Sequence, residues 1–410
     1  MNNKTILATC YAVNPYKGSE DAMGWNFVNQ IARFNKVYAV TRENNKTAIE
    51  KYISENPNAV YNNITFLYFD LPYWMRFWKK GGRGAMLYYY MWQKGIVNFV
   101  RKQNIDFDIA HNVNFHNDWT PSFLWKLNKP MVWGPIGHHP LIPKQYLKSY
   151  SSKYLVKDRA TWMVKKYFWN YSSPLKKTVK NAAHILCMNS GVPAVLKLKE
   201  QSFSILPSVA TEDFAKNIET KNNNFNIISV GRFVPLKGFD LTLVSYLKFI
   251  DSLPLFEKKN CKLTLVGSGP EKDFYRQIII DNDAESYVEI IEWIDRKDLM
   301  KIYEKSSVFL FPSHEGAGMV VAEALSFGLP VVCLDNEGPG QFINSSCGIS
   351  IPESNYENTV SQLSEALLKL YSDKALLDKM GIAARRQYEE KFTWDSRGEH
   401  LKNIYKALSK

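Results

Sequence analysis

Two glutamates, Glu315 and Glu323, stand eight residues apart in a segment that mixes glycine with apolar residues. A carboxylate accepts hydrogen bonds from neighbouring hydroxyl groups, such as those of a sugar or a ribose. The surrounding pattern places Glu315 on a loop and Glu323 more than one turn inside a helix. We therefore interpret them as two separate hydroxyl-binding groups and not as an acid/base pair.

A glycine-rich turn lies between the two glutamates. The sequence predicts a strand at 308–312 that leads into this turn, and a helix that begins near Gly318 and ends at Gly328. Glycine lets the backbone approach a ligand closely, and the first N–H groups of a helix favour an anion. The residues predicted to hold a phosphate are Gly316, Ala317, Gly318, Met319 and Val320.

Two cations, Arg232 and Lys237, stand in the segment S-V-G-R-F-V-P-L-K-G at 229–238. The pattern places them in the loop after the first strand of the second half of the chain. Arginine supplies a planar fork and lysine a point charge, a combination that suits a diphosphate. Taken alone, both are better explained as solvated surface cations. Their position upstream of Glu315, at the start of the same strand series, favours a functional interpretation.

Other candidate residues lie in the first half. Gly18 follows the first predicted strand, where its backbone could approach a phosphate or an acceptor. His111 stands at a strand end, and two interpretations stay open: a structural histidine, or a residue near the ligand. His138 and His139 are adjacent, so their side chains tend to point apart, and no third ligand stands nearby. We expect no metal site.

The elements that must position these residues alternate regularly. Apolar strands separated by helical segments are typical of a parallel sheet covered on both faces. The first series of strands is predicted at 5–13, 37–42, 64–70, 108–113, 131–136 and 184–189. The second series is predicted at 225–233, 261–266, 288–294, 308–312 and 330–334. The fold class is therefore α/β, with two doubly wound, Rossmann-like domains.

A polar, asparagine-rich stretch at 211–226 separates the two series. We expect a hinge near 206–224, a first domain over 1–205 and a second domain over 206–395. Ligands of such sheets bind beyond the carboxyl ends of the strands, which is where the candidate residues stand.

Composition excludes several classes of protein. The 410 residues are 45% hydrophobic and 22% charged, as in an ordinary globular protein, which excludes wholesale disorder. No apolar run approaches the ~20 residues of a membrane-spanning helix, and no signal peptide is evident, so we expect a cytoplasmic protein. The five cysteines are scattered, without a C-x-x-C pair, and are expected to be buried thiols.

The net charge of +12 is divided unevenly along the chain. Residues 1–200 carry 28 Lys/Arg against 11 Asp/Glu, whereas residues 201–410 carry 24 against 29. Two segments, 73–94 and 144–180, combine many basic residues with aromatic ones and hold a single acidic residue, Asp158. This composition suits the headgroup region of an anionic membrane. It could also bind RNA, but no RNA-binding motif accompanies it, so we favour a membrane surface over nucleic acid. A solvated basic face over an aromatic core remains the plain alternative.

The segment with the two glutamates and the segment with the two cations resemble a known family. E-G-A-G-M-V-V-A-E at 315–323 resembles the E-x7-E signature of the family-4 (group 1) retaining glycosyltransferases, which have the GT-B fold. V-G-R-F-V-P-L-K-G at 230–238 is similar to a second segment of that family. The resemblance implies that Glu315 contacts the donor sugar and that Glu323 binds the ribose. It assigns Arg232 and Lys237 to the leaving diphosphate.

The resemblance also extends to less specific positions. It implies that Gly18 belongs to an N-terminal glycine loop near the donor, that His111 helps to position the donor sugar, and that the backbone of Ile294 meets the nucleobase. V-W-G-P-I-G-H-H at 132–139 resembles the acceptor loop of the family, with His138 in place of a glycine. In the GT-B fold the two domains face a central cleft, and the last helix, here 396–410, returns to the N-terminal domain.

The implied activity is sugar transfer with retention from a UDP- or GDP-linked donor to a glycan or lipid-linked acceptor. The resemblance implies no metal and no cofactor, and we expect no nucleic-acid partner. A peripheral position on the inner face of the cell membrane stays open. Two alternatives also stay open: a nucleotide-sugar epimerase of the same fold, and a basic membrane- or RNA-binding scaffold without catalysis.

Overall fold

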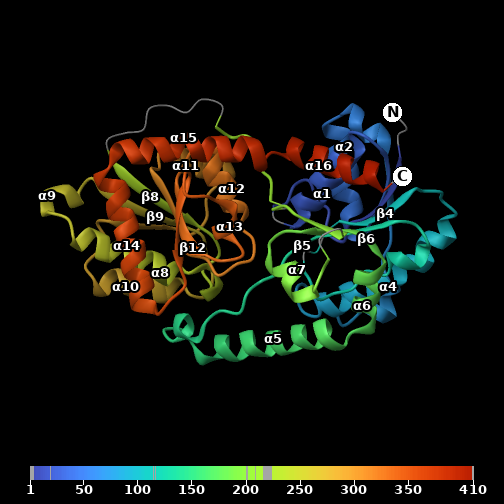
Figure 1. Cartoon of the computed structure of the whole chain (residues 1–410), viewed down its shortest axis with the longest axis horizontal. Coiled ribbons are helices and arrows are strands. Elements are labelled where there is room, and N and C mark those ends of the chain that lie inside the picture. The colour runs from blue at the N-terminus through green and yellow to red at the C-terminus, as the bar shows by residue number, and fades with distance from the viewer. Residues whose placement is uncertain are drawn as a thin grey trace. The chain divides into compact units, whose positions relative to one another are not determined.

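The computed structural model describes residues 4–18, 20–113, 115, 117–199, 202–207, 209–215 and 224–408. The chain divides into two units, each built around one parallel sheet (Figure 1). The first unit comprises Met1–His138, Met163–Ser208 and Trp394–Lys410, and the second comprises His139–Trp162 and Val209–Thr393. Residues 208 and 216–223 of the predicted hinge lie outside the described residues.

The sheet of the first unit has the strand order β3-β2-β1-β4-β5-β6-β7. Every neighbouring pair is parallel. The order reverses between β1 and β4, so the sheet is doubly wound. The strands are β1 (Thr5–Thr9), β2 (Lys36–Thr41), β3 (Ile64–Tyr68), β4 (Ile109–Asn112), β5 (Met131–Ile136), β6 (Ala182–Cys187) and β7 (Phe203–Ile205).

The sheet of the second unit has the order β10-β9-β8-β11-β12-β13 and is also parallel throughout. Its order reverses between β8 and β11. The strands are β8 (Phe225–Val230), β9 (Cys261–Val266), β10 (Val288–Ile291), β11 (Val308–Phe311), β12 (Val331–Asp335) and β13 (Gly348–Pro352). The predicted α/β class with two doubly wound sheets is confirmed.

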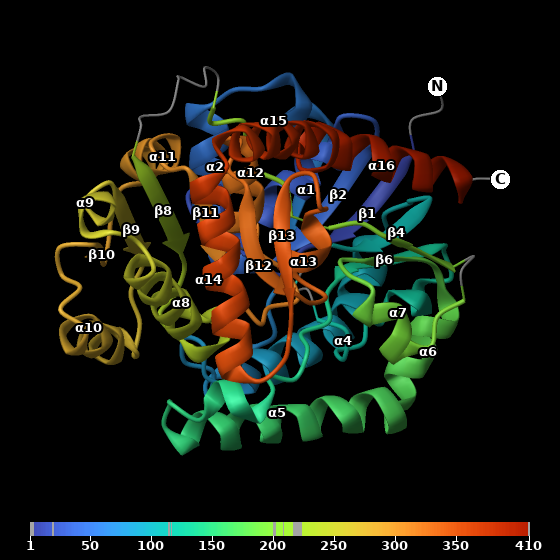
Figure 2. The same cartoon turned by 60° about the vertical axis from the view of Figure 1, so that its left-hand side comes forward.

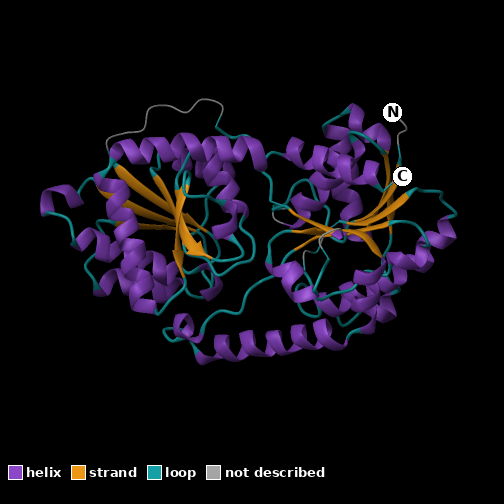
Figure 3. Ribbon diagram, viewed as in Figure 1, coloured by secondary structure: helices purple, strands orange, loops and turns teal. Residues whose placement is uncertain are grey.

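Helices cover both faces of each sheet (Figure 3). The helices of the first unit are α1 (Glu20–Ala32), α2 (Lys46–Glu55), α3 (Tyr73–Arg76), α4 (Ala85–Gln103), α6 (Ser173–Asn181), α7 (Gly191–Leu196) and α16 (Trp394–Ala407). Those of the second unit are α8 (Phe239–Asp251), α9 (Leu255–Lys258), α10 (Lys272–Asp281), α11 (Arg296–Glu304), α12 (Met319–Ser326), α13 (Pro339–Phe342), α14 (Tyr356–Ser372) and α15 (Lys374–Lys391). One further helix, α5 (Ser152–Tyr171), has residues in both units.

The core of the second unit follows the two-residue period of its strands. Leu310 packs with α8, α10 and α14 on one face of the sheet, whereas Phe309 and Phe311 pack with α11, α12 and α15 on the other. In the first unit, α4 covers one face, and α1 packs between β2 and α16. Packing on both faces fixes the position of each strand, and therefore the position of the loop that follows it.

The predicted strands are all found, but two edge strands, β7 and β13, were missed. β7 has only three residues, and β13 begins with a glycine and ends with a proline, so neither shows a long apolar run. Several predicted strands are also too long at their carboxyl ends. Val13 is fully buried although β1 ends at Thr9, which shows that apolar character reports burial and not strand pairing.

The predicted first domain, 1–205, needs a correction at 139–162, because this segment packs with the second unit. Tyr146 and Tyr150 are buried in the core that also contains α8 and α14. The hydroxyl of Tyr150 donates to Asp240 Oδ1 at 2.6 Å, and the hydroxyl of Tyr146 donates to the carbonyl of Ser354 at 2.9 Å. Tyrosines that bury their rings and satisfy their hydroxyl groups bind this segment to the second unit.

The five cysteines are free and buried, as the sequence predicts. None of the helices in the described part of the chain is long and apolar enough to cross a membrane.

Candidate active site

The candidate residues of the second unit meet where the strand order reverses. β8 and β11 are neighbours in the sheet, and both point their carboxyl ends to the same edge. The loop 231–238 follows β8 and the loop 312–318 follows β11. A ligand site of a doubly wound sheet lies at such a point.

Backbone contacts hold these two loops against each other. The N–H of His314 donates to the carbonyl of Leu236 at 2.9 Å, and the Ser313 hydroxyl donates to the same oxygen at 3.1 Å. Gly238 has φ of +65°, and a Cβ at this residue would lie 2.1 Å from the carbonyl oxygen of Pro312. Only glycine allows this approach. The close contact sets the distance between Lys237 and Glu315.

Lys237 and Glu315 form an ion pair across the two loops. Lys237 Nζ lies 2.7 Å from Glu315 Oε2, and both side chains are 16% exposed. Lys237 Nζ also lies 5.2 Å from the centre of the Phe311 ring, which adds a cation–π contact. The structure therefore brings together one predicted diphosphate-binding cation and one predicted hydroxyl-binding carboxylate.

Arg232 lies on the same loop as Lys237 but is exposed. Its guanidinium forms no ion pair with any residue that the structure describes. The loop thus presents one cation that is bound to Glu315 and one that is open to solvent.

The helix predicted to begin near Gly318 is α12, which begins at Met319. Gly318 occupies the N-cap position and has no side chain to accept a hydrogen bond from the first turn. The amides of Gly318, Met319 and Val320 therefore stand at an uncapped helix N-terminus, next to Glu315 in the chain. This terminus adds partial positive charge beside Lys237.

The amide of Gly316 has a partner that the sequence did not indicate. Its N–H donates to His139 Nδ1 at 3.1 Å, and both residues belong to the second unit. The sequence singled out His139 only as a metal ligand to be rejected. Its contact with the glycine turn depends on the packing of 139–162, which no local pattern reveals.

Glu323 is buried, with only 3% of its surface exposed. Its Oε1 accepts a hydrogen bond from the guanidinium of Arg296 at 2.8 Å, and its Oε2 lies 3.5 Å from the hydroxyl of Tyr303. Burial and the charge of Glu323 raise the pKa of Tyr303, which keeps this hydroxyl protonated as a donor. Arg296 was missed because it is one of many charged residues at a helix start, and only the fold shows that it faces Glu323.

The segment around Ile294 differs from the prediction. β10 ends at Ile291, three residues earlier than expected. Glu292 lies on the surface and pairs with Lys272 and Arg276, while Trp293 is 77% exposed and does not belong to the core. Ile294 packs partly against the core face that contains α12. Its predicted contact with a nucleobase stays a prediction.

His111 and Gly18 belong to the first unit. His111 is fully buried at the end of β4, with Nε2 2.6 Å from the carbonyl oxygen of Gly134 and Nδ1 2.5 Å from the hydroxyl of Tyr405. A carbonyl only accepts, so Nε2 carries the proton and Nδ1 accepts from Tyr405. Both ring nitrogens have partners within the first unit, which favours the structural interpretation of His111. Its predicted role near the donor sugar stays a prediction. Gly18 lies in an exposed turn with open space around it.

Within the described residues, no three side chains of His, Cys, Asp or Glu gather in a way that could hold a metal ion. Of the two adjacent histidines, His138 is buried and places Nδ1 2.7 Å from Asp118 Oδ2, while His139 contacts Gly316.

The site geometry can be compared with known proteins. Residues 210–387, which include both candidate glutamates and both candidate cations, match the family model described as "Glycosyl transferases group 1". This match covers less than half of the 410 residues. The family signal thus covers the second unit, where Lys237 and Glu315 form their ion pair.

One similar relative of this group 1 domain is a GDP-mannose-dependent monoacylated alpha-(1-6)-phosphatidylinositol monomannoside mannosyltransferase of Corynebacterium glutamicum. The chain is 27% identical to it over 184 residues, which cover 43% of this chain and 45% of the relative. The chain thus spans less than half the length of this curated relative.

Solved structures show the fold of the whole chain. A glycosyltransferase from Rickettsia africae matches with a TM-score of 0.66 and 15% identity over 100% of both chains. WaaG, a glycosyltransferase involved in lipopolysaccharide biosynthesis, matches with a TM-score of 0.61 and 17% identity over 97% of this chain and 99% of its own. The chain has the GT-B fold.

The Arg296–Glu323 pair leads to a stability prediction. Arg296→Met should lower the free energy of unfolding by about 1–3 kcal/mol, because the Glu323 carboxylate stays buried after its cationic partner is lost. Urea unfolding at neutral pH measures this change.

A matched control is Arg276→Met, since Arg276 pairs with Glu292 on the surface. An exposed pair contributes about 0–1 kcal/mol, so the control should change stability little. Equal effects of the two substitutions would show that Arg296 does not stabilise the buried Glu323 carboxylate.

His111 leads to a prediction on pH. Burial lowers the pKa of His111 to about 4, whereas the unfolded chain takes up this proton near the ordinary histidine pKa of 6.5. Protons then favour the unfolded state as the pH falls from 6.5 towards 4. Between pH 7.5 and pH 5 the wild type should lose about 2 kcal/mol more stability than His111→Gln. Urea unfolding of both proteins at the two pH values is the measurement, and an identical pH dependence would show that His111 does not titrate this way.

Proposed function

We propose that the chain is a retaining, metal-independent glycosyltransferase that moves a sugar from a UDP- or GDP-linked donor to an acceptor. The observation that carries this proposal is the Lys237–Glu315 ion pair at the point where the strand order reverses, beside the uncapped start of α12. Cations and helix amides suit a diphosphate, and a carboxylate beside them suits the sugar hydroxyls.

Donor binding would replace the Lys237–Glu315 ion pair by a new partner for each residue. The diphosphate attracts Lys237, Arg232 and the amides at Gly318–Val320, and this frees the Glu315 carboxylate for hydroxyl groups of the sugar. Each charge has a partner before and after the exchange, so neither is left unpaired in a partly buried site. Charge that develops on the leaving diphosphate then meets groups that are already oriented towards it.

Glu323 would bind the ribose of the donor. Arg296 and Tyr303 hold its carboxylate in one place, 3% exposed, so that little freedom is lost when a ribose hydroxyl donates to it. Arg296 is a positioning residue in this scheme, because it acts through Glu323.

Retention would follow without a covalent sugar–protein intermediate. In the donor complex Glu315 would accept from the sugar hydroxyls and Glu323 would stay beside Arg296, so neither carboxylate would be left as a free nucleophile. The acceptor oxygen attacks the anomeric carbon from the face that the diphosphate leaves. The bond to the phosphate oxygen breaks, the new glycosidic bond forms, and the acceptor hydroxyl passes its proton to the leaving phosphate.

The acceptor is proposed to be a glycan or a lipid-linked glycan bound by the first unit. The names of the relatives support this class, since one acts on a phosphatidylinositol mannoside and another belongs to lipopolysaccharide biosynthesis. These names favour sugar transfer over epimerisation. The basic and aromatic composition of residues 1–200 supports a peripheral position on the anionic inner face of the membrane.

Substitution of the two glutamates should have different effects on nucleotide binding and on kcat. Glu323→Ala should weaken nucleotide binding about tenfold, because it removes a charged acceptor from the ribose. Glu315→Ala should lower kcat about 100-fold while nucleotide affinity changes little. Calorimetric titration with UDP and GDP and steady-state kinetics separate the two effects. Glu289→Ala is the control, because Glu289 is a surface residue that pairs with Lys262. Unchanged binding and kinetics in both site variants would refute the site.

Chelation tests the metal-independent part of the proposal. Activity should survive EDTA, because Lys237, Arg232 and the start of α12 supply the positive charge that a divalent cation would otherwise supply. Rates are compared after dialysis against EDTA and after addition of Mn²⁺. A loss with EDTA that Mn²⁺ restores would support a metal-dependent reaction instead.

A further inference from the structure

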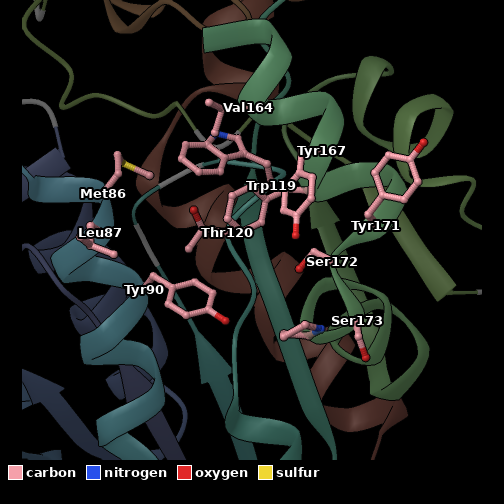
Figure 4. Close-up of a pocket in the computed structure, with 12 residues that line it drawn as sticks. Met86, Leu87, Tyr90, Trp119, Thr120, Val164, Tyr167, Tyr171, Ser172 and Ser173 are labelled. Atoms are coloured by element: carbon pink, nitrogen blue, oxygen red, sulfur yellow. The ribbon is translucent and has the colours of Figure 1, made fainter. Parts of the chain in front are cut away.

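An apolar pocket in the first unit lies apart from the residues discussed so far. Its volume is about 500 Å³, within the range of small-molecule sites. Figure 4 shows Met86, Leu87 and Tyr90 of α4 on one side, Val164 and Tyr167 of α5 on another, and Trp119 between them. The wall is therefore built mainly from aromatic and aliphatic side chains.

The helix that forms one wall, α5, is unusual in its exposure. None of its twenty residues is buried, although many are apolar. Figure 2 shows α5 as one long helix, drawn in green. Val156, Met163, Tyr167 and Tyr171 are 60% to 73% exposed and are spaced by four or seven residues, so they share one face of this helix. An exposed apolar stripe of this length is a contact surface. The helix is not apolar enough to span a membrane, so it suits a position in the headgroup region.

The segments that line the pocket are basic in sequence. Residues 163–180 carry five lysines and no acidic residue, and residues 73–94 carry five basic residues and no acidic one. The start of α6 also lines the pocket through Ser172, Ser173 and Pro174, and a helix start carries partial positive charge. An apolar pocket whose rim is formed by basic segments of the chain is complementary to an amphiphile that has a hydrocarbon chain and an anionic head.

We propose that this pocket binds the hydrocarbon chain of a phosphate-bearing acceptor lipid, with the phosphate at the basic rim. The inference rests on the proposed function, because this lipid would be the acceptor of the transferred sugar. The chain of the lipid would leave the bilayer along the apolar stripe of α5 and enter between α4 and α5. Burial of the hydrocarbon chain in the pocket keeps it out of water. This offsets the free-energy cost of moving the lipid head group from the bilayer towards the acceptor site.

The pocket matches this occupant better than it matches a polar one. A nucleotide or a free sugar would bring many hydrogen-bonding groups against a wall of aromatic and aliphatic side chains, where they would lose water without gaining partners. A solvated basic face, the plain alternative, explains the lysines but not the hollow or the exposed stripe beside them.

The test uses farnesyl phosphate as the probe, titrated by calorimetry below its aggregation concentration. The wild type should bind one equivalent saturably, and inorganic phosphate should not bind in the same range. Val164→Glu and Leu87→Glu place a charge on opposite walls, and both residues are at least 48% exposed, so the fold should tolerate them. Each should weaken binding about tenfold or more.

Val156→Glu is the matched control, because Val156 lies on the same stripe of α5 but does not line the pocket. It should change the affinity less than about twofold. Equal loss in all three variants, or in none, would overturn the pocket and leave only non-specific contact with α5.

Thermal shift with UDP and GDP on the same proteins separates the two proposals. Nucleotide binding belongs to the second unit and should be unchanged in every variant. If the nucleotides bind and farnesyl phosphate does not, the pocket proposal fails alone. If farnesyl phosphate binds and neither nucleotide does, the proposed function fails while a lipid site remains.

Discussion

The ion pair between Lys237 and Glu315 depends on a close approach of two loops that are far apart in sequence. The loops after β8 and β11 meet because these strands are neighbours at the point where the order of the sheet reverses. Gly238 allows one loop to reach the carbonyl of Pro312, and the backbone of His314 then bonds to Leu236. The start of α12 and the position of Glu323 follow from the same geometry, because the helix begins directly after this loop.

Electrostatics in the second unit are local. Residues 201–410 carry more acidic than basic residues, yet the candidate site presents Arg232, Lys237 and a helix start. Glu315 and Glu323 each hold one cation in place, so the site is organised before any ligand arrives. Such preorganisation is what stabilises developing charge efficiently, since no dipole has to turn during the reaction.

The first unit has the opposite character. Residues 1–200 carry more basic than acidic residues, and none of the residues of α5, which has residues in both units, is buried. The net charge of +12 is therefore the sum of two different surfaces and says nothing about the phosphate site.

The sequence by itself determined the strand series, the α/β class and the loops that carry Lys237 and Glu315, because burial on both sheet faces forces continuous apolar strands. It could not determine contacts between distant segments, since these depend on which surfaces pack together. Only the tertiary structure showed that Arg296 holds Glu323, that 139–162 packs with the second unit, and that Tyr405 occupies the second ring nitrogen of His111. The local sequence determines the chemistry that a side chain can perform, whereas packing determines which partners it has and therefore whether it is available for that chemistry.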